Sequence, residues 1–168
     1  SIRFISSHTF SGCSSLREIN IPDTVEYIES DAFANCSSLS RIDIPDSVTE
    51  IRYRAFSGCS GLRELNLPNT NVYIQQNAFA NCTGLTSLTI PAAISRIDQF
   101  AFAGCSNIKD LNIHCKTISF DSTVFQNVNS LERVSFTGES VSLNSGYSSG
   151  LFQNRTSLKI VTFPSKMA

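Results

Sequence analysis

The stretch AFANCSSLSRIDIPDSVTEI, residues Ala32–Ile51, decides the fold of this 168-residue chain. In its first half Phe33, Cys36 and Leu39 lie three residues apart, which is the spacing of one face of a short helical or 3₁₀ turn. In its second half, RIDI at residues 41–44 alternates charged and apolar residues, as a strand with one buried face does. A proline then ends the strand because it has no N–H to donate to a neighbouring strand. The stretch therefore predicts one turn followed by one short strand.

The same pattern recurs along the whole chain, and a fixed period of this kind indicates a repeat architecture. Phenylalanine recurs every 23 residues through six copies, and a seventh copy follows after 27 residues. One such unit cannot bury its own apolar residues, whereas stacked units align them into a continuous core. We expect two core columns, which are Phe10, Phe33, Phe56, Phe79, Phe102, Phe125 and Phe152, and Cys13, Cys36, Cys59, Cys82 and Cys105.

The repeats predict a solenoid of the α/β class with 23-residue coils. Equivalent strands should pair in parallel about 4.8 Å apart and form one short sheet on the concave face, with helical or 3₁₀ turns on the convex side. Asp31 and Asn77 are expected to cap these turns, and a brief second extended segment should follow each strand. We expect one domain over residues 1–168, with about six repeats, a partial repeat at each end, and a Ser- and Gly-rich loop within residues 137–150. We also expect the chain to be part of a longer protein.

Charge, hydropathy and the spacing of reactive residues exclude several classes of function. Thirteen basic and fourteen acidic residues give a net charge of −1, which supplies no basic field for nucleic acid. No apolar run approaches the roughly 18 residues that span a bilayer, so we expect no direct membrane insertion. His8 and His114 lie roughly four to five coils apart and cannot share a site. We expect no enzyme activity, no catalytic residue, no bound metal and no cofactor.

The cysteine column allows two interpretations. A period of 23 residues is unlike any Cys-x-x-Cys metal motif, but adjacent coils could bring Cα atoms within the roughly 4.4–6.8 Å that a disulfide requires. We favour free, buried thiols, because cysteine is among the most often buried residues and the coils use it in the same way. Cys115 lies outside the column and is expected to be partly exposed. In native protein, a thiol reagent should therefore modify at most Cys115.

Polar side chains line the outward side of the predicted sheet in two columns. One interpretation is a solvated face, on which the alternating charges of Glu18, Arg41 and Glu64 stabilise neighbouring strands by about 0.2–1 kcal/mol per pair. The other is a concave binding platform that offers carboxylate, amide and guanidinium groups to a protein or glycan. The candidate binding residues are Glu18, Asn20, Arg41, Asp43, Glu64, Asn66, Asp110, Asn112 and Arg133, and Ser87, Thr89 and Ser135 complete the columns.

A second candidate surface is a variable column in the brief extended segment. It contains Tyr27, Glu50, Tyr73 and Arg96, with Tyr53 nearby. Tyrosine and arginine are frequent hot-spot residues of protein interfaces, but they are equally suited to covering the edge of a core. Tyr27, Tyr53, Tyr73 and Arg96 are therefore alternative binding residues.

The stretch Ala32–Ile51, with its relatives at Phe10–Ile28 and Ala78–Ile97, resembles the BspA-like, or treponemal-type, leucine-rich repeat. The likeness covers about six units and a partial one at each end. It departs from the general leucine-rich pattern at the ninth position, where Thr24 and Ser47 stand in place of asparagine or cysteine. The resemblance implies a right-handed leucine-rich-repeat solenoid whose convex phenylalanine and cysteine fill the core in place of an asparagine ladder.

The resemblance also implies a function without catalysis. It implies a secreted or cell-surface protein of bacteria or parasitic protists that adheres to host proteins or to other cells. The expected partner is an extracellular-matrix or cell-surface protein or glycoprotein, and the expected location is extracellular or at the cell surface. The alternative is a structural spacer, whose repeats hold another functional domain away from the surface and bind nothing themselves.

Overall fold

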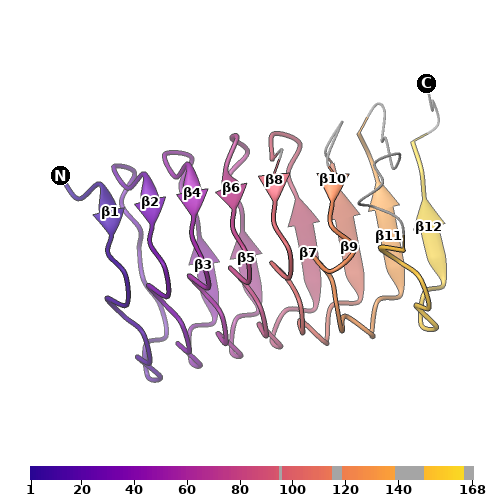
Figure 1. Ribbon diagram of the computed structural model, residues 1–168, viewed down its shortest axis with the longest axis horizontal. Helices are drawn as coiled ribbons and strands as arrows, with labels where there is room; N and C mark the ends of the chain where they lie inside the picture. The colour runs from indigo at the N-terminus through magenta and orange to yellow at the C-terminus, as the bar shows by residue number, and fades with distance from the viewer. Residues whose placement is uncertain (95, 115–118, 139–149, 165–168) are drawn as a thin grey trace.

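The computed structural model describes residues 1–94, 96–114, 119–138 and 150–164, which form a stack of parallel β-coils with the termini at opposite ends (Figure 1). The predicted parallel solenoid is confirmed, because strand partners such as Tyr27 and Glu50, or Arg41 and Glu64, are 23 residues apart. Cys115 and nearly all of the predicted loop within residues 137–150 lie outside the described residues.

The brief extended segments form a continuous six-stranded sheet, in the order β1-β2-β4-β6-β8-β10. Ile28, Ile51 and Ile74 occupy the same position of successive strands and are buried, which holds the strands in register. We call the outward side of this sheet the short-strand face. Its strands are β1 (Phe4–Ile5), β2 (Tyr27–Ile28), β4 (Glu50–Ile51), β6 (Tyr73–Ile74), β8 (Arg96–Ile97) and β10 (Ser119–Phe120).

The longer strands lie where the sequence predicted one sheet, but the ladder is divided. β3 and β5 form one pair, and β7, β9, β11 and β12 form a four-stranded sheet. At the division Leu65 of β5 is only partly buried, whereas Ile42 of β3 and Leu88 of β7 are buried. We call the outward side of all six strands the long-strand face. They are β3 (Arg41–Asp43), β5 (Glu64–Asn66), β7 (Ser87–Ile90), β9 (Asp110–Ile113), β11 (Arg133–Phe136) and β12 (Ile160–Thr162).

The core contains a column of stacked phenylalanine rings. Phe33, Phe56 and Phe79 are 0% exposed, and successive ring centroids are 5.0 and 5.1 Å apart with ring planes within 5°. Each of these rings is therefore held between the rings of the coils on either side. The column continues through the buried Phe102 and Phe125, and its first member, Phe10, is only partly buried. Phe152, expected in the same column, is partly buried and instead meets the Phe136 ring edge-on, with centroids 6.4 Å apart.

The cysteine column is hydrogen-bonded as well as buried. Each buried thiol donates to the backbone oxygen of the phenylalanine one coil before it, at 3.1 to 3.2 Å. The donors are the free thiols of Cys36, Cys59, Cys82 and Cys105. Cys13, expected in the same buried column, is exposed, because no coil covers its outer side within the described residues. The expectation that at most Cys115 would react is therefore wrong, since Cys13 is also accessible.

Arg155 takes the place of the cysteine in a later coil. Its Nη2 donates to the backbone oxygen of Phe125 at 2.7 Å, and its Nη1 donates to that of Val128 at 2.9 Å. The guanidinium thus supplies the donor that a thiol supplies in the earlier coils. Burial lowers the pKa of Arg155, because a charged group loses hydration inside the protein.

The turns are not helical, contrary to the sequence prediction: within the described ranges no residue is in a helix. Asp31 and Asn77 are not helix caps but have φ angles of 54° and 59°, in the left-handed region. A second left-handed residue follows four positions later, as at Asn35. Between the two left-handed residues, every second backbone N–H points to the next coil. Phe33 N–H, for example, donates to Ala55 O at 2.7 Å. The turn therefore extends the ladder between coils instead of closing a helix.

The second left-handed position alternates between glycine and asparagine in successive coils. The alternation has a steric cause, because a Cβ built on Gly58 would lie 2.3 Å from Asn35 Oδ1, and one on Gly104 would lie 2.2 Å from Asn81 Oδ1. The Asn35 and Asn81 side chains thus occupy the space over the next coil's glycine. The coils therefore come in two kinds that alternate through Gly12, Asn35, Gly58, Asn81, Gly104 and Asn127.

Candidate binding surfaces

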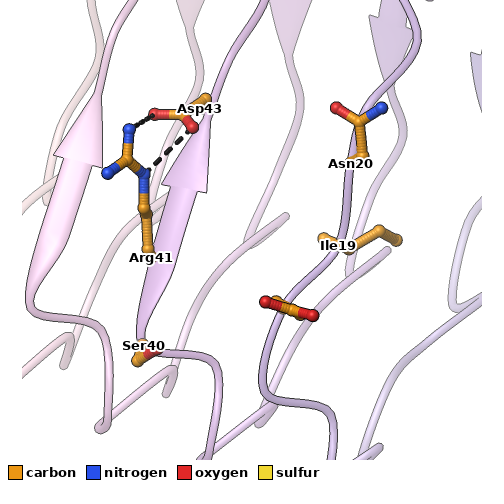
Figure 2. A pocket seen from close by; sticks show the side chains of 6 residues that line it. Ile19, Asn20, Ser40, Arg41 and Asp43 are labelled. Atoms are coloured by element: carbon orange, nitrogen blue, oxygen red, sulfur yellow. Dashed lines mark hydrogen bonds and ion pairs between the residues drawn. The ribbon is translucent and has the colours of Figure 1, made fainter.

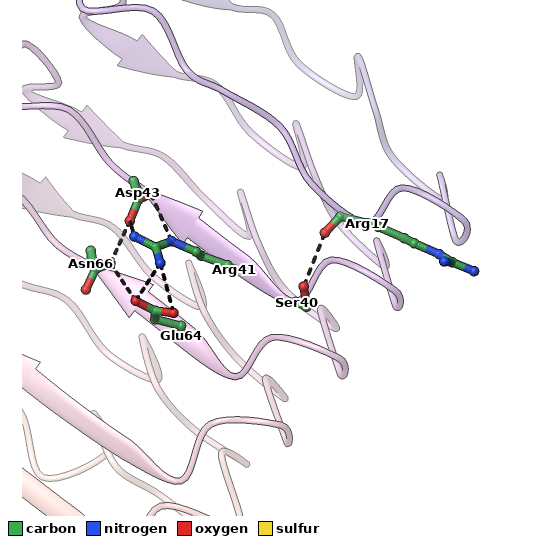
Figure 3. A network of polar contacts seen from close by, with 6 residues as sticks. All are labelled: Arg17, Ser40, Arg41, Asp43, Glu64 and Asn66. Carbon is green, nitrogen blue, oxygen red and sulfur yellow. Dashed lines mark hydrogen bonds and ion pairs between the residues drawn. The ribbon is translucent and has the colours of Figure 1, made fainter.

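The long-strand face carries a compact polar cluster on β3 and β5, which we call the Arg41 cluster (Figure 3). Arg41 Nε donates to Asp43 Oδ2 at 3.0 Å, and Arg41 Nη1 lies 3.1 Å from Glu64 Oε1. Asn66 Nδ2 donates to Asp43 Oδ1 at 2.6 Å and to Glu64 Oε1 at 3.2 Å. Parallel pairing of Arg41 with Glu64 and of Asp43 with Asn66 brings the four side chains together. The cluster presents both charge signs in a fixed arrangement.

The electrostatics of the Arg41 cluster follow from these contacts. Hydrogen bonds from Arg41 and then Asn66 lower the pKa of Asp43, because they favour its ionised form. Asp43 in turn raises the pKa of Arg41. The side chains of Arg41 and Glu64 are 55% and 50% exposed, so water screens the pair and its contribution to stability is small, at about 0–1 kcal/mol.

A second ion pair joins β9 and β11 of the long-strand face. Arg133 Nη2 donates to Asp110 Oδ2 at 2.8 Å, and its Nε also bonds that carboxylate. The division between β5 and β7 separates this pair from the Arg41 cluster. The predicted columns are therefore two clusters, joined by the small side chains of Ser87 and Thr89.

A hollow of about 570 Å³ lies between β3 and residues 18–20, which run beside β3 without forming a strand (Figure 2). In the part of the chain that the structure describes, Glu18 and Asn20 have no hydrogen-bond or ion-pair partner for their side chains. The hollow thus sets unpaired polar groups beside the ordered Arg41 cluster. It is lined by Glu18, Ile19, Asn20, Ser40, Arg41 and Asp43.

The short-strand face aligns the alternative binding residues Tyr27, Tyr73 and Arg96 with Glu50 on adjacent strands. The Arg96 guanidinium lies over the Tyr73 ring, 4.2 Å from its centroid. The Tyr73 hydroxyl donates to Asp98. Burial and then this bond raise the pKa of Tyr73.

Three charged residues that contact this column, Arg52, Glu29 and Asp98, were missed by the sequence analysis. Arg52 lies over the Tyr27 ring at 5.1 Å, and its Nη1 donates to Glu29 Oε2 at 2.7 Å. Asp98 receives the Tyr73 hydroxyl. Strand alternation could have found these residues, because each lies two positions after a member of the predicted column. Tyr53 lies apart from the column and is 42% exposed.

The two histidines and the other potential metal ligands do not come together in the described part of the chain. His8 and His114 are both exposed and lie in different coils. Among the described residues, no group of three or more His, Cys, Asp or Glu side chains could hold a metal ion. Over the same ranges, no helix is long and apolar enough to cross a membrane. Both surfaces carry ordered charged groups, to which the long-strand face adds amide groups and the short-strand face adds aromatic rings.

Comparison with known proteins gives a family. The sequence matches the BspA type leucine rich repeat region in six copies, over residues 1–91 and 62–168. Among curated proteins, none matches the chain.

Several solved structures have a fold similar to that of this chain. TpLRR, a leucine rich repeat protein of T. pallidum, is 25% identical over 83% of this chain and 65% of its own, with a TM-score of 0.71. A leucine-rich repeat protein from Bacteroides ovatus is 23% identical over 96% of this chain and 64% of its own, with a TM-score of 0.61. The pneumococcal vaccine antigen PcpA is 18% identical over 84% of this chain and 40% of its own, with a TM-score of 0.65. The chain thus spans slightly less than two thirds of the first two proteins.

Proposed function

The chain belongs to the BspA-type leucine-rich repeat family, and from this premise we propose that it is a non-enzymatic, protein-binding adhesion module of a secreted or cell-surface protein. Leucine-rich repeat solenoids typically serve as scaffolds for binding, because stacking coils creates an extended surface without a reaction centre. The proposed partner is a protein or glycoprotein of the extracellular matrix or of a neighbouring cell. The vaccine-antigen description of PcpA supports an extracellular location for the family fold.

The observation that carries this proposal is the hollow beside the Arg41 cluster. Glu18 and Asn20 are exposed and unpaired within the described ranges, so a partner can bind them without breaking a contact. The adjacent Arg41, Asp43 and Glu64 are already ordered by their own contacts, which lowers the entropy lost on binding. Free groups beside preordered groups are the arrangement that favours specific recognition.

The experiment is capture from a panel of extracellular-matrix and plasma proteins, with bound proteins identified by mass spectrometry. The test variant is Asn20→Arg, which fills the hollow, and the matched control is Asn69→Arg on an exposed turn. We expect wild type and Asn69→Arg to retain the same partner and Asn20→Arg to lose it. Equal retention by all three proteins would remove the hollow as the site.

The alternative function is a structural spacer. It is favoured by the internal pairing of the charges on both faces, since Arg41, Arg52, Arg96 and Arg133 all have a carboxylate partner within the chain. A spacer needs no external partner. The spacer account predicts no saturable binding to any protein of the panel, by wild type or by either variant.

A further inference from the structure

The corner at which each turn enters its long strand carries a row of aligned residues. We call this set the corner row, and it starts at Arg17, immediately before the long-strand face. Basic and small hydroxylated residues alternate through its first five positions. Its members are Arg17, Ser40, Arg63, Thr86, Lys109, Glu132 and Lys159.

Three basic residues of the corner row, Arg17, Arg63 and Lys109, are the least neutralised in the described part of the chain, whereas Lys159 pairs with Glu132. Of its eleven arginine and lysine residues, eight lie within 4.0 Å of a carboxylate. Arg155 instead donates to backbone oxygens. Only Arg17 and Arg63 of those eleven have neither kind of partner, and Lys109 lies 3.9 Å from its nearest carboxylate and is 58% exposed.

Glu132 is the one acidic member of the corner row, and it pairs with Lys159 at 2.9 Å and lies 3.9 Å from Lys109. The acidic residues that follow Arg63 and Lys109 in the sequence are bound elsewhere. Glu64 is bound by Arg41, and Asp110 is bound by Arg133, both on the long-strand face. Figure 3 shows the Arg17 side chain directed away from the Arg41 cluster. The positive charges of Arg17 and Arg63 are therefore available to a partner, and the Lys109 charge is only partly neutralised.

The spacing of these charges is set by the two kinds of coil. Arg17, Arg63 and Lys109 fall in the coils that carry glycine at the second left-handed position, while Ser40 and Thr86 fall in those that carry asparagine. Parallel strands are about 4.8 Å apart, so the charges recur at about 10 Å. The Ser40 hydroxyl donates to the backbone oxygen of Arg17 at 3.4 Å, which holds this short side chain against the protein surface. No long side chain of the corner row stands between successive positive charges.

We propose that the corner row binds a linear acidic polysaccharide that carries an anionic group on every second sugar. An extended sugar chain advances by roughly one coil spacing per ring, so alternate sugars meet alternate coils. Sulfate or carboxylate groups would then face Arg17, Arg63 and Lys109, and the uncharged sugars between them would face the serine and threonine positions. Arginine is well suited to such groups, because its planar donors bind two anionic oxygens at once.

Nucleic acid fits the corner row less well. Proteins that bind single strands stack the bases on aromatic side chains, and the corner row contains none. The net charge of −1 also supplies no general attraction for a densely charged phosphate backbone. The row matches a sparse, regularly spaced polyanion instead, and this site is separate from the hollow proposed for a protein partner.

The test is binding of the 168-residue chain to immobilised hyaluronan, a glycosaminoglycan with one carboxylate on every second sugar, with neutral dextran and single-stranded DNA as comparison ligands. The test variant is Arg17→Ser/Arg63→Ser/Lys109→Thr, which places serine or threonine at all of the first five positions of the corner row. The matched control is Arg41→Ser/Arg96→Ser/Arg133→Ser, which removes the same charge from paired positions. A spacing variant, Ser40→Arg/Arg63→Ser, keeps the charge of wild type but breaks the two-coil interval. Circular dichroism establishes that each variant is folded before binding is measured.

We expect wild type to bind hyaluronan and not dextran, with affinity that falls as salt rises above about 0.1 M because the contacts are exposed. The corner-row and spacing variants should lose at least about tenfold in affinity, while the paired-position control stays within about threefold of wild type. The proposal is overturned if wild type does not bind hyaluronan at low salt, or if the two triple variants lose equal affinity. It is also overturned if DNA binds as tightly as hyaluronan, or if the spacing variant binds like wild type.

Discussion

Removal of the Phe56 ring should be among the most destabilising single changes to the stack. The ring is 0% exposed and lies 5.0 and 5.1 Å from the rings of Phe33 and Phe79. In Phe56→Ala the cavity cannot collapse, because backbone hydrogen bonds such as Phe56 N–H to Ala78 O, at 2.8 Å, fix the coil spacing. Comparable substitutions cost about 3–5 kcal/mol. For a chain of this size, that cost lowers the melting temperature by about 6–20 °C.

The assay is urea unfolding of wild type, Phe56→Ala and Phe10→Ala, followed by circular dichroism. Phe10 is the matched control, because it is only partly buried and stacks on one neighbouring ring. Its removal should cost about half as much, roughly 1.5–2.5 kcal/mol. A cost below about 1 kcal/mol for Phe56→Ala, or equal costs for the two variants, would refute the stacked core.

Three further changes test the coil contacts. Gly58→Ala should lower the free energy of unfolding by about 1–2 kcal/mol more than Gly12→Ala, as measured by thermal unfolding. Both glycines have left-handed φ angles, but of the two only Gly58 would place the new Cβ against an asparagine oxygen, at 2.3 Å. Equal losses would contradict the steric account. Burial raises the pKa of Cys59 to about 12, whereas in the unfolded chain the pKa is about 8.5. Above about pH 8.5 only the unfolded chain loses this proton, so the free energy of unfolding should decrease as the pH rises from 8.5 toward 12. The loss of stability at high pH should be smaller in Cys59→Ala. At neutral pH a thiol reagent should modify Cys13 long before Cys59. Rapid modification of both thiols would contradict the buried column. Arg155→Ala should lower the free energy of unfolding by about 2–3 kcal/mol and speed amide hydrogen exchange mainly in residues 150–164, because the guanidinium hydrogen bonds are lost. Unchanged exchange in these residues would exclude the bonding role of Arg155.

The stack could be predicted from the sequence because the period recurs in several residue columns at once. Phe33, Cys36 and Leu39 are buried, as are their counterparts in the inner coils, so the fold class follows from burial alone. The helical turn was wrong because a spacing of three residues also arises from a turn with two left-handed residues. The alternation of Asn35 and Gly58 in one column was the available signal for that conformation.

The candidate surfaces were predicted only in part. The columns of Arg41 and of Tyr73 follow from strand alternation, which fixes the residues that face outward. Which side chains pair depends on the distance between coils, so neither the division between β5 and β7 nor the hollow beside Asn20 is visible in the sequence. The exposure of Cys13 depends on which coils flank it, a property of the whole stack and not of the repeat.

The most direct test of the adhesion account is an equilibrium titration with the protein captured from the extracellular panel. Wild type is compared with Arg41→Glu/Glu64→Arg, which keeps the net charge but exchanges the two signs at the centre of the long-strand face. We predict saturable binding by wild type and at least a tenfold weaker affinity for the exchanged variant, about 1.4 kcal/mol, with both proteins equally folded by circular dichroism. Equal affinities for the two proteins, or no saturation with wild type, would contradict the account.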